Sequence, residues 1–168
     1  LPQLTVAENI AMGVWPKSRA GLIDWKFIRK NSIDILKTIG IDINPDLLVN
    51  SLPVALRQMV EIGKMLAQNP DLIIFDEPTA PLSHDEVIVL FNLIENLKKQ
   101  GKGIIFISHR LEEVLSISDR ITVMKDGNTV ITDIATNFTE RKLISSMVGR
   151  EISEIFPPKP RLTGKENV

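Results

Sequence analysis

The stretch that decides the fold is residues 72–79, which read Leu-Ile-Ile-Phe-Asp-Glu-Pro-Thr. The four apolar residues predict a short strand, and the residues that follow the two acids favour a turn. Open α/β sheets bind their ligands just beyond the carboxyl ends of their strands. Asp76 and Glu77 therefore stand where a ligand site is expected, although an acidic pair alone would indicate no more than a solvated strand end.

A second strand is predicted further along the chain, where apolar residues 104–107 lead into Ser108 and His109. The segment between the two strands has apolar residues at helical spacing: Val87, Leu90, Ile94 and Leu97. Parallel strands need such a crossover, so the sequence predicts an α/β fold with buried, parallel strands. An imidazole beside the acids can hold a water molecule or donate to a phosphate oxygen. A lone histidine at a strand end would more simply be structural. The position of His109 after Asp76 and Glu77 in the sequence favours a functional role.

The rest of the chain is organised around this centre. Residues 1–70 are predicted to be mostly helical. Helix starts are predicted at a capping box of Thr5 and Glu8 and at Asp24, and helix ends at Gly40 and before the Asn69-Pro70 pair. Residues 71–150 are predicted to form the α/β part, with a helix at 110–118, strands at 120–125 and 129–132 around an Asp126-Gly127 turn, and a helix at 139–148. Residues 151–168 are proline-containing and linker-like.

Composition excludes several classes of protein. The 168 residues are 43% hydrophobic and 24% charged, which is ordinary for a globular domain, and the net charge of -1 gives no reason to expect nucleic acid as a partner. The absence of cysteine excludes disulfides and thiolate metal sites. The apolar stretches are shorter than the roughly 20 residues that span a bilayer, and no signal-peptide pattern follows Leu1. We expect an internal fragment of a cytoplasmic protein.

The chemical motifs together resemble those of ABC-type ATPases. Three segments resemble the Walker B, D-loop and switch-histidine motifs of that family: Asp-Glu-Pro-Thr-Ala at 76–80, Pro-Leu-Ser at 81–83 and Ile-Ser-His-Arg at 107–110. The resemblance implies part of a P-loop NTPase domain that uses ATP and Mg²⁺. It implies that Asp76 acts toward the metal, that Glu77 is the general base and that His109 senses the γ-phosphate. It also implies nucleotide contacts at Pro81, Leu82 and Ser83.

The family's signature motif, Leu-Ser-Gly-Gly-Gln, corresponds here to Leu-Pro-Val-Ala-Leu at residues 52–56. The serine hydroxyl and the glutamine amide are therefore missing. Proline is tolerated at the first position of a helix, with Ser51 or Leu52 as a cap before it. The resemblance implies weakened nucleotide contacts at Pro53, Val54, Ala55 and Leu56, to which Arg57 could add charge. The alternative is a helix start without a phosphate role.

Several segments narrow the resemblance to ATPases that energise uptake of ribose, galactose, xylose and related sugars. They include Leu-Thr-Val-Ala-Glu-Asn-Ile at 4–10, Gln-Met-Val-Glu-Ile at 58–62 and Met-Val-Gly-Arg-Glu at 147–151. The resemblance implies the C-terminal part of the first of two tandem ATPase domains, with residues 151–168 as the linker to the second. Its implied partners are membrane permease subunits docked near residues 5–70, the second ATPase domain and, indirectly, a solute-binding protein. Its implied location is peripheral, on the cytoplasmic face of the membrane.

The sequence holds no phosphate loop of the form Gly-x-x-x-x-Gly-Lys-Ser/Thr. Truncation explains this better than loss of function, and this chain alone is expected to be inactive. Two alternatives stay open: a non-transport ABC ATPase of DNA repair or translation, and a non-catalytic interaction module. His84 is interpreted as a solvated residue, and Trp15 and Trp25 as core packing or partner contacts rather than sugar-stacking aromatics.

Overall fold

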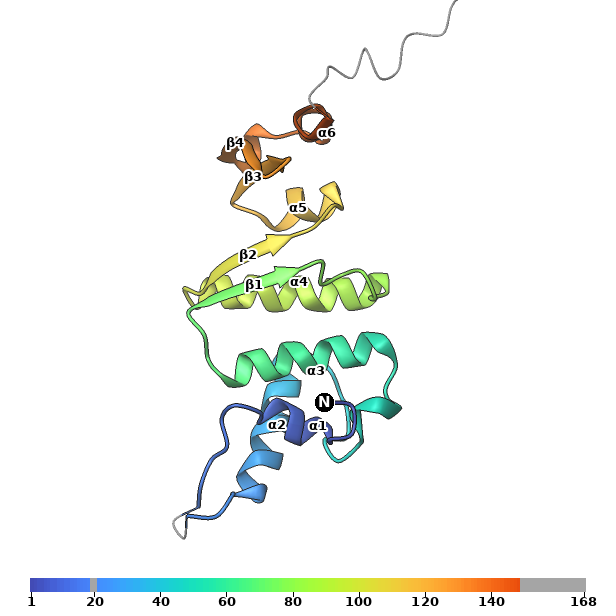
Figure 1. Ribbon diagram of the computed structural model, residues 1–168, viewed down its shortest axis with the longest axis vertical. Helices are drawn as coiled ribbons and strands as arrows, with labels where there is room; N and C mark the ends of the chain where they lie inside the picture. The colour runs from blue at the N-terminus through green and yellow to red at the C-terminus, as the bar shows by residue number, and fades with distance from the viewer. Residues whose placement is uncertain (19–20, 149–168) are drawn as a thin grey trace, which may run out of the picture. The chain divides into compact units, whose positions relative to one another are not determined.

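The computed structural model describes residues 1–18 and 21–148 (Figure 1). The chain divides after Ser108 into two compact units. The predicted linker at 151–168 lies outside the described residues. Among those that are described, no helix is both long and apolar enough to cross a membrane.

Helices dominate the start of the first unit. They are α1 (Val6–Ile10), α2 (Trp25–Ile39), the 3₁₀ turn η1 (Val49–Ser51) and α3 (Val54–Ala67). The predicted capping box is confirmed, because the Glu8 amide donates to Thr5 Oγ1 at 3.2 Å and the Thr5 amide donates to Glu8 Oε2 at 2.7 Å. Asp24 caps α2, and Gly40 ends it in the left-handed conformation, with φ of 86°. Both helix ends agree with the prediction.

The helices of this unit pack around a shared apolar core. Its buried members are Val6, Ile10, Leu36, Ile43, Val49, Leu52 and Val60. Gly63 allows the close approach of α3 to its neighbours, because a Cβ atom at this position would lie 3.3 Å from Ile10 Cδ1 and 3.4 Å from Ile39 Cδ1. The core thus fixes α3 against α1 and α2.

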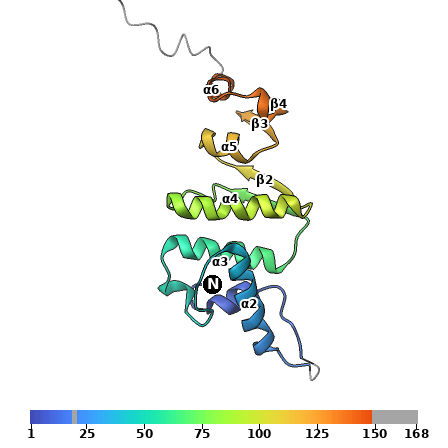
Figure 2. The ribbon, with the colours of Figure 1, turned by 180° about the vertical axis from the view of Figure 1, so that it is seen from behind.

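Two parallel strands follow, β1 (Leu72–Asp76) and β2 (Gly103–Ile107), joined by α4 (His84–Lys99). Figure 1 and Figure 2 both show α4 alongside the strands, and Phe91 of α4 meets Phe106 of β2 edge to face with ring centroids 5.9 Å apart. The parallel pairing and the crossover helix were predicted. On the side of this pair that α4 covers, Ile73 and Phe75 are buried.

The prediction that both strands are buried is wrong for the other face. Four apolar side chains of the two strands are each between 44% and 61% exposed: Leu72, Ile74, Ile105 and Ile107. Parallel strands are usually covered on both faces. Among the described elements of the first unit, helix α4 covers one face of the pair and none covers the other, which accounts for the exposure.

The second unit has a small core of its own. Its elements are α5 (Leu111–Ile117), β3 (Arg120–Lys125), β4 (Asn128–Ile134), the 3₁₀ turn η2 (Ala135–Asn137) and α6 (Glu140–Val148). Strands β3 and β4 pair antiparallel. Asp126 and Gly127 turn between them with φ of 50° and 77°, as the predicted hairpin requires. The core consists of Ile121, Val123, Phe138 and Leu143.

Candidate functional site

The two acidic residues of the candidate site lie at the end of β1. Asp76 is its last residue and pairs in register with Ile107 of β2. The next amide, that of Glu77, donates to the Ile107 carbonyl at 2.9 Å. Asp76 is exposed and Glu77 is half-buried. Both carboxylates therefore stand at the carboxyl end of a parallel strand pair, as the sequence predicted.

Glu77 has an unusual backbone conformation. Its φ is +46°, in the left-handed region that non-glycine residues rarely adopt. Such a conformation costs on the order of 1–3 kcal/mol and persists where the surroundings determine it. Here the surroundings are the bond to Ile107 and the buried Pro78 and Thr79, of which Thr79 is 0% exposed. The sequence carried no signal for this strained turn.

The D-loop segment continues directly into α4. Leu82 is buried and its amide donates to the Thr79 carbonyl at 3.1 Å, whereas Pro81 and Ser83 are exposed. Ser83 is the N-cap of α4: the Glu86 amide donates to its Oγ at 3.4 Å, and its own amide donates to Glu86 Oε2 at 2.7 Å. This second capping box was not predicted, although the Ser-x-x-Glu spacing is its signal in the sequence.

The signature segment starts α3 differently from the prediction. Pro53 is the N-cap and not the first helical residue, with φ of -55° and ψ of 156°, and no side chain caps the helix. Ser51 does not serve as the predicted cap, because its hydroxyl donates to the Leu48 carbonyl at 2.7 Å. Val54 is exposed, and Ala55 and Leu56 are half-buried. The N-terminus of α3, which is the positive end of the helix dipole, therefore has no capping side chain.

Arg57 is also engaged within the chain. Its Nε donates to the Leu52 carbonyl at 2.8 Å and its Nη2 donates to the Asn50 carbonyl at 3.1 Å. The guanidinium therefore ties the first turn of α3 to the turn before it. In this arrangement Arg57 holds the signature segment, and the idea that it turns toward an anion has no support.

His109 is the first residue of the second unit and is exposed. It follows the end of β2 by two residues. Because Asp76 and Glu77 belong to the first unit, the distance between the histidine and the acids stays a prediction. The exposed His84 opens α4, as its interpretation as a solvated residue requires.

Comparison with known proteins shows what the chain resembles. No family model matches it. A ribose import ATP-binding protein from Chelativorans sp. is 46% identical over 158 residues, which are 94% of this chain and 30% of that protein. A xylose import ATP-binding protein from Geobacillus kaustophilus is 43% identical over 164 residues, or 98% of this chain and 32% of that protein. Nearly the whole chain is therefore similar to one part of sugar-import ATP-binding proteins.

A further relative and a solved structure show the same similarity. An arabinose import ATP-binding protein from Yersinia pestis is 43% identical over 169 residues, covering 100% of this chain and 32% of that protein. A dimeric ATP-binding cassette solved with ADP and phosphate after hydrolysis is 26% identical, with a TM-score of 0.71, and the match covers 82% of this chain and 60% of that cassette. The predicted resemblance and fold class are confirmed.

The chain covers only part of the proteins that it matches. It spans 30–32% of the length of the sugar-import relatives above. Its predicted place, in the first of two tandem ATPase domains, stays a prediction. Hydrolysis, transport and partners of the whole protein are accordingly proposals.

The residues of this chain fit one part of a Mg-ATP site. No group of three or more His, Cys, Asp or Glu that could hold a metal occurs in the part of the chain that the structure describes. Mg²⁺ does not need one, because it is commonly bound through one or two carboxylates, water and substrate phosphates. The exposed carboxylate of Asp76 at the strand end fits that requirement. The phosphate-binding loop is absent from the sequence, so the grip on the phosphates is not part of this chain.

Electrostatic shifts are found away from these motifs. The hydrogen bond and charge of Asp46 raise the pKa of Arg29. A hydrogen bond from Asn137 and one from the Ile134 amide lower the pKa of Asp133. These shifts belong to surface interactions and give no separate evidence of catalysis.

Proposed function

We propose that this chain is part of a longer ABC-type ATPase that hydrolyses ATP to drive the import of a sugar. The observation that carries the proposal is the match of nearly the whole chain to import ATP-binding proteins for xylose, ribose and arabinose. These relatives favour sugar import over a role in DNA repair or translation. ATP hydrolysis by the full-length protein with its permease, stimulated by one of these sugars, tests the function.

The acids at the end of β1 have separate roles in this proposal. Asp76 would hold Mg²⁺, directly or through water, and Glu77 would accept a proton from the attacking water. The bound metal supplies charge neutralisation at the phosphates. The backbone of Glu77 is fixed by its bond to Ile107, which supports a precisely placed base.

His109 is proposed to contact the γ-phosphate beside these acids. It follows Ile107 by two residues, and two residues of extended chain span at most about 7 Å. The Ile107 carbonyl itself accepts the hydrogen bond of the Glu77 amide. The short connection limits how far the backbone of the histidine can lie from Ile107, and an imidazole can donate to a phosphate oxygen.

A second surface is proposed to complete the site of an opposing ATPase domain. Pro53, Val54, Ala55 and Leu56 would present the positive end of α3 to the γ-phosphate held there, and residues 81–83 would add contacts from the D-loop. The helix N-terminus is exposed at Pro53 and Val54. Without a serine hydroxyl this composite site is weakened rather than lost.

Restoring the signature tests that proposal. Pro53→Ser with Leu56→Gln in the full-length protein is expected to tighten ATP binding by the closed, Glu77→Gln-trapped form by about 1–3 kcal/mol, the value of one or two hydrogen bonds. Because Pro53 is the N-cap, serine would also cap α3 and stabilise the helix. The measurement is ATP affinity with and without the double change.

A matched control separates capping from phosphate contact. Pro53→Asp with Leu56→Gln also caps α3, but its carboxylate repels the γ-phosphate. The aspartate variant should raise the melting temperature like the serine variant without tightening ATP binding. Unchanged or weaker ATP affinity in the serine variant would show that residues 53–56 are only a helix start.

An exposed aromatic pair is proposed to contact the membrane permease. Trp15 and Trp25 are 40% and 53% exposed, and their rings meet edge to face with centroids 6.1 Å apart. Trp25 stands outside the buried face of α2, so the core-packing interpretation is wrong for this residue. Leu22 and Phe27 are exposed nearby in the sequence. An exposed aromatic cluster of this kind favours a protein partner.

Trp25→Ala in the full-length protein is expected to weaken binding to the permease by tenfold or more, roughly the effect of losing an interface hot spot. ATP hydrolysis by the unbound protein should stay unchanged. Ile88→Ala serves as control, because Ile88 is 48% exposed on α4 outside this aromatic cluster. Equal permease affinity of the two variants, measured by titration in detergent, would remove Trp25 from the interface.

The remaining parts of the proposal follow from the family. The protein would lie on the cytoplasmic face of the membrane, with a second ATPase domain in the same polypeptide and a solute-binding protein acting through the permease. The choice of sugar would belong to those other subunits. A non-catalytic interaction module is the alternative that the missing phosphate loop keeps open, and the full-length sequence separates the two by containing that loop or lacking it.

A further inference from the structure

A short connection joins the signature helix α3 to the strand that carries the acids. After Ala67, the last residue of α3, only residues 68–71 precede β1. Asn69 in this connection has φ of +46°, and its amide donates to the Leu66 carbonyl at 2.9 Å. The direction in which α3 leaves β1 is therefore set by a few residues.

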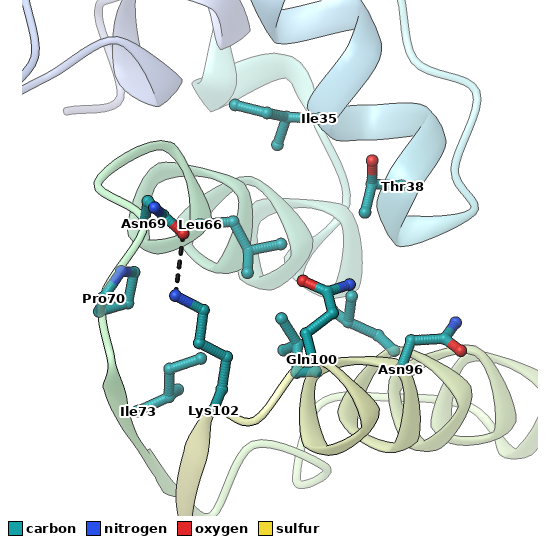
Figure 3. A pocket seen from close by; sticks show the side chains of 11 residues that line it. Ile35, Thr38, Leu66, Asn69, Pro70, Ile73, Asn96, Gln100 and Lys102 are labelled. Carbon is teal, nitrogen blue, oxygen red and sulfur yellow. Dashed lines mark hydrogen bonds between the residues drawn. The ribbon is translucent and has the colours of Figure 1, made fainter.

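The side chain of Lys102, the residue just before β2, contacts this connection. Its Nζ donates to Asn69 Oδ1 at 3.0 Å (Figure 3) and lies 3.5 Å from Asp71 Oδ1. The Lys102 side chain is only 15% exposed, although its acidic partner is fully exposed. The adjacent Gly103 amide donates to the Asp71 carbonyl at 2.8 Å. One lysine just before β2 thus holds the connection between the end of α3 and the start of β1.

A pocket of about 180 Å³ lies beside this lysine, between the helical part and the α/β part of the first unit. Ile35 and Leu66 line it from α2 and α3, and Ile73 lines it from β1 (Figure 3). Leu93 of α4 also lines it, and several of the polar residues around it are exposed. Close-packed elements resist relative movement, and the pocket interrupts the apolar contact between the two parts. The polar contact through Lys102 is therefore positioned to restrain α3 where this apolar contact is interrupted.

We propose that Lys102 is a positioning residue that sets the direction of the signature helix relative to the Walker B strand, an inference that rests on the function proposed above. Helix α3 has 14 residues and so is about 21 Å long. A tilt of about 5° at its carboxyl end would move its first turn by about 2 Å. Misplacement by about 1 Å can cost on the order of 100-fold in rate.

The test uses the full-length protein in the Glu77→Gln background. Lys102→Met should weaken the affinity of the ATP-dependent closed state by roughly tenfold, a moderate misplacement effect, and leave ATP affinity of the open state unchanged. Lys102→Arg should retain most of the closed-state affinity, because arginine keeps a hydrogen-bond donor. Lys99→Met is the control, since Lys99 is exposed in the last turn of α4.

A second variant keeps the inference testable if Lys102→Met fails to fold. Asn69→Gly removes the acceptor, and glycine adopts the left-handed conformation without strain. It should weaken closure, and the double variant should be no worse than Lys102→Met alone, because Lys102→Met already removes the contact with Asn69 as well as the one with Asp71. Additive losses, or a closed-state affinity equal to that of Lys99→Met with only a lower melting temperature, would overturn the positioning role.

Failure of the proposed function and failure of the positioning role give different results. Unmodified full-length protein that neither hydrolyses ATP nor closes with it would reject the proposed function, and with it this inference. Normal hydrolysis that Glu77→Gln abolishes, combined with no effect of Lys102→Met or Asn69→Gly on closure, would reject the positioning role alone.

Discussion

Glu77→Gln in the full-length protein is expected to lower single-turnover ATP hydrolysis at this site by roughly 10²–10⁴-fold, while ATP still binds. Glutamine has nearly the same shape as glutamate but cannot accept the proton of the attacking water. The backbone of residue 77 is held by its bond to the Ile107 carbonyl, so the substitution should leave the strand end intact. Measurement requires single turnover, because a second ATPase domain would mask the loss at steady state.

His109→Ala is expected to lower the same rate through loss of the proposed γ-phosphate contact. Glu140→Gln serves as the control for both variants, since Glu140 is an exposed residue at the start of α6. Rates within about threefold of the unmodified protein for both Glu77→Gln and His109→Ala would remove these residues from catalysis, because loss of a general base costs far more.

The second large effect concerns the 168-residue chain by itself, which is expected to show no saturable Mg-ATP binding in the micromolar range. Backbone amides and a lysine of a phosphate loop normally hold the phosphates, and the sequence contains no such loop. The carboxylates of Asp76 and Glu77 repel a triphosphate. Calorimetric titration of this chain and of the full-length protein makes the comparison.

Neutralising the acids in this chain provides the control. Asp76→Asn with Glu77→Gln removes the repulsion but supplies no cradle, so micromolar binding should still be absent. A saturable micromolar Kd in the unmodified chain would show that ATP is held by residues other than a phosphate loop.

The local features of the fold could be predicted because short-range chemistry determines them. The capping box at Thr5 and Glu8, the cap at Asp24 and the stop at Gly40 each depend on residues within one turn of a helix. The apolar stretches and the helical pattern between them likewise predicted β1, α4 and β2 in order. Pro53 was predicted to be the first helical residue of α3, whereas it is the N-cap. The error arose because both positions accept the fixed φ of proline.

Features that depend on distant contacts could not be predicted in the same way. An apolar run does not reveal what covers each face of its strand, so the exposure of Leu72 and Ile74 was missed. The bond from Lys102 to Asn69 joins residues 33 positions apart, and neither residue type indicates the other. The left-handed conformation of Glu77 depends on the neighbouring strand and the buried turn after it.

The candidate site was predicted only in part. The strand-end rule placed Asp76 and Glu77 correctly, and the structure positions them against Ile107 of the neighbouring strand. The D-loop and signature residues were located by resemblance. The capping role of Ser83 and the carbonyl bonds of Arg57 came only from the structure. The approach of His109 to the acids and all nucleotide contacts stay predictions.

The most direct test of the central claim is sugar uptake by liposomes that contain the permease and the full-length protein, with ATP enclosed. Labelled xylose, ribose and arabinose are added outside with the solute-binding protein. The account predicts that at least one sugar accumulates with ATP and that Glu77→Gln reduces its accumulation strongly. ATP hydrolysis without accumulation of any of the three sugars, or equal accumulation with Glu77→Gln, would contradict it.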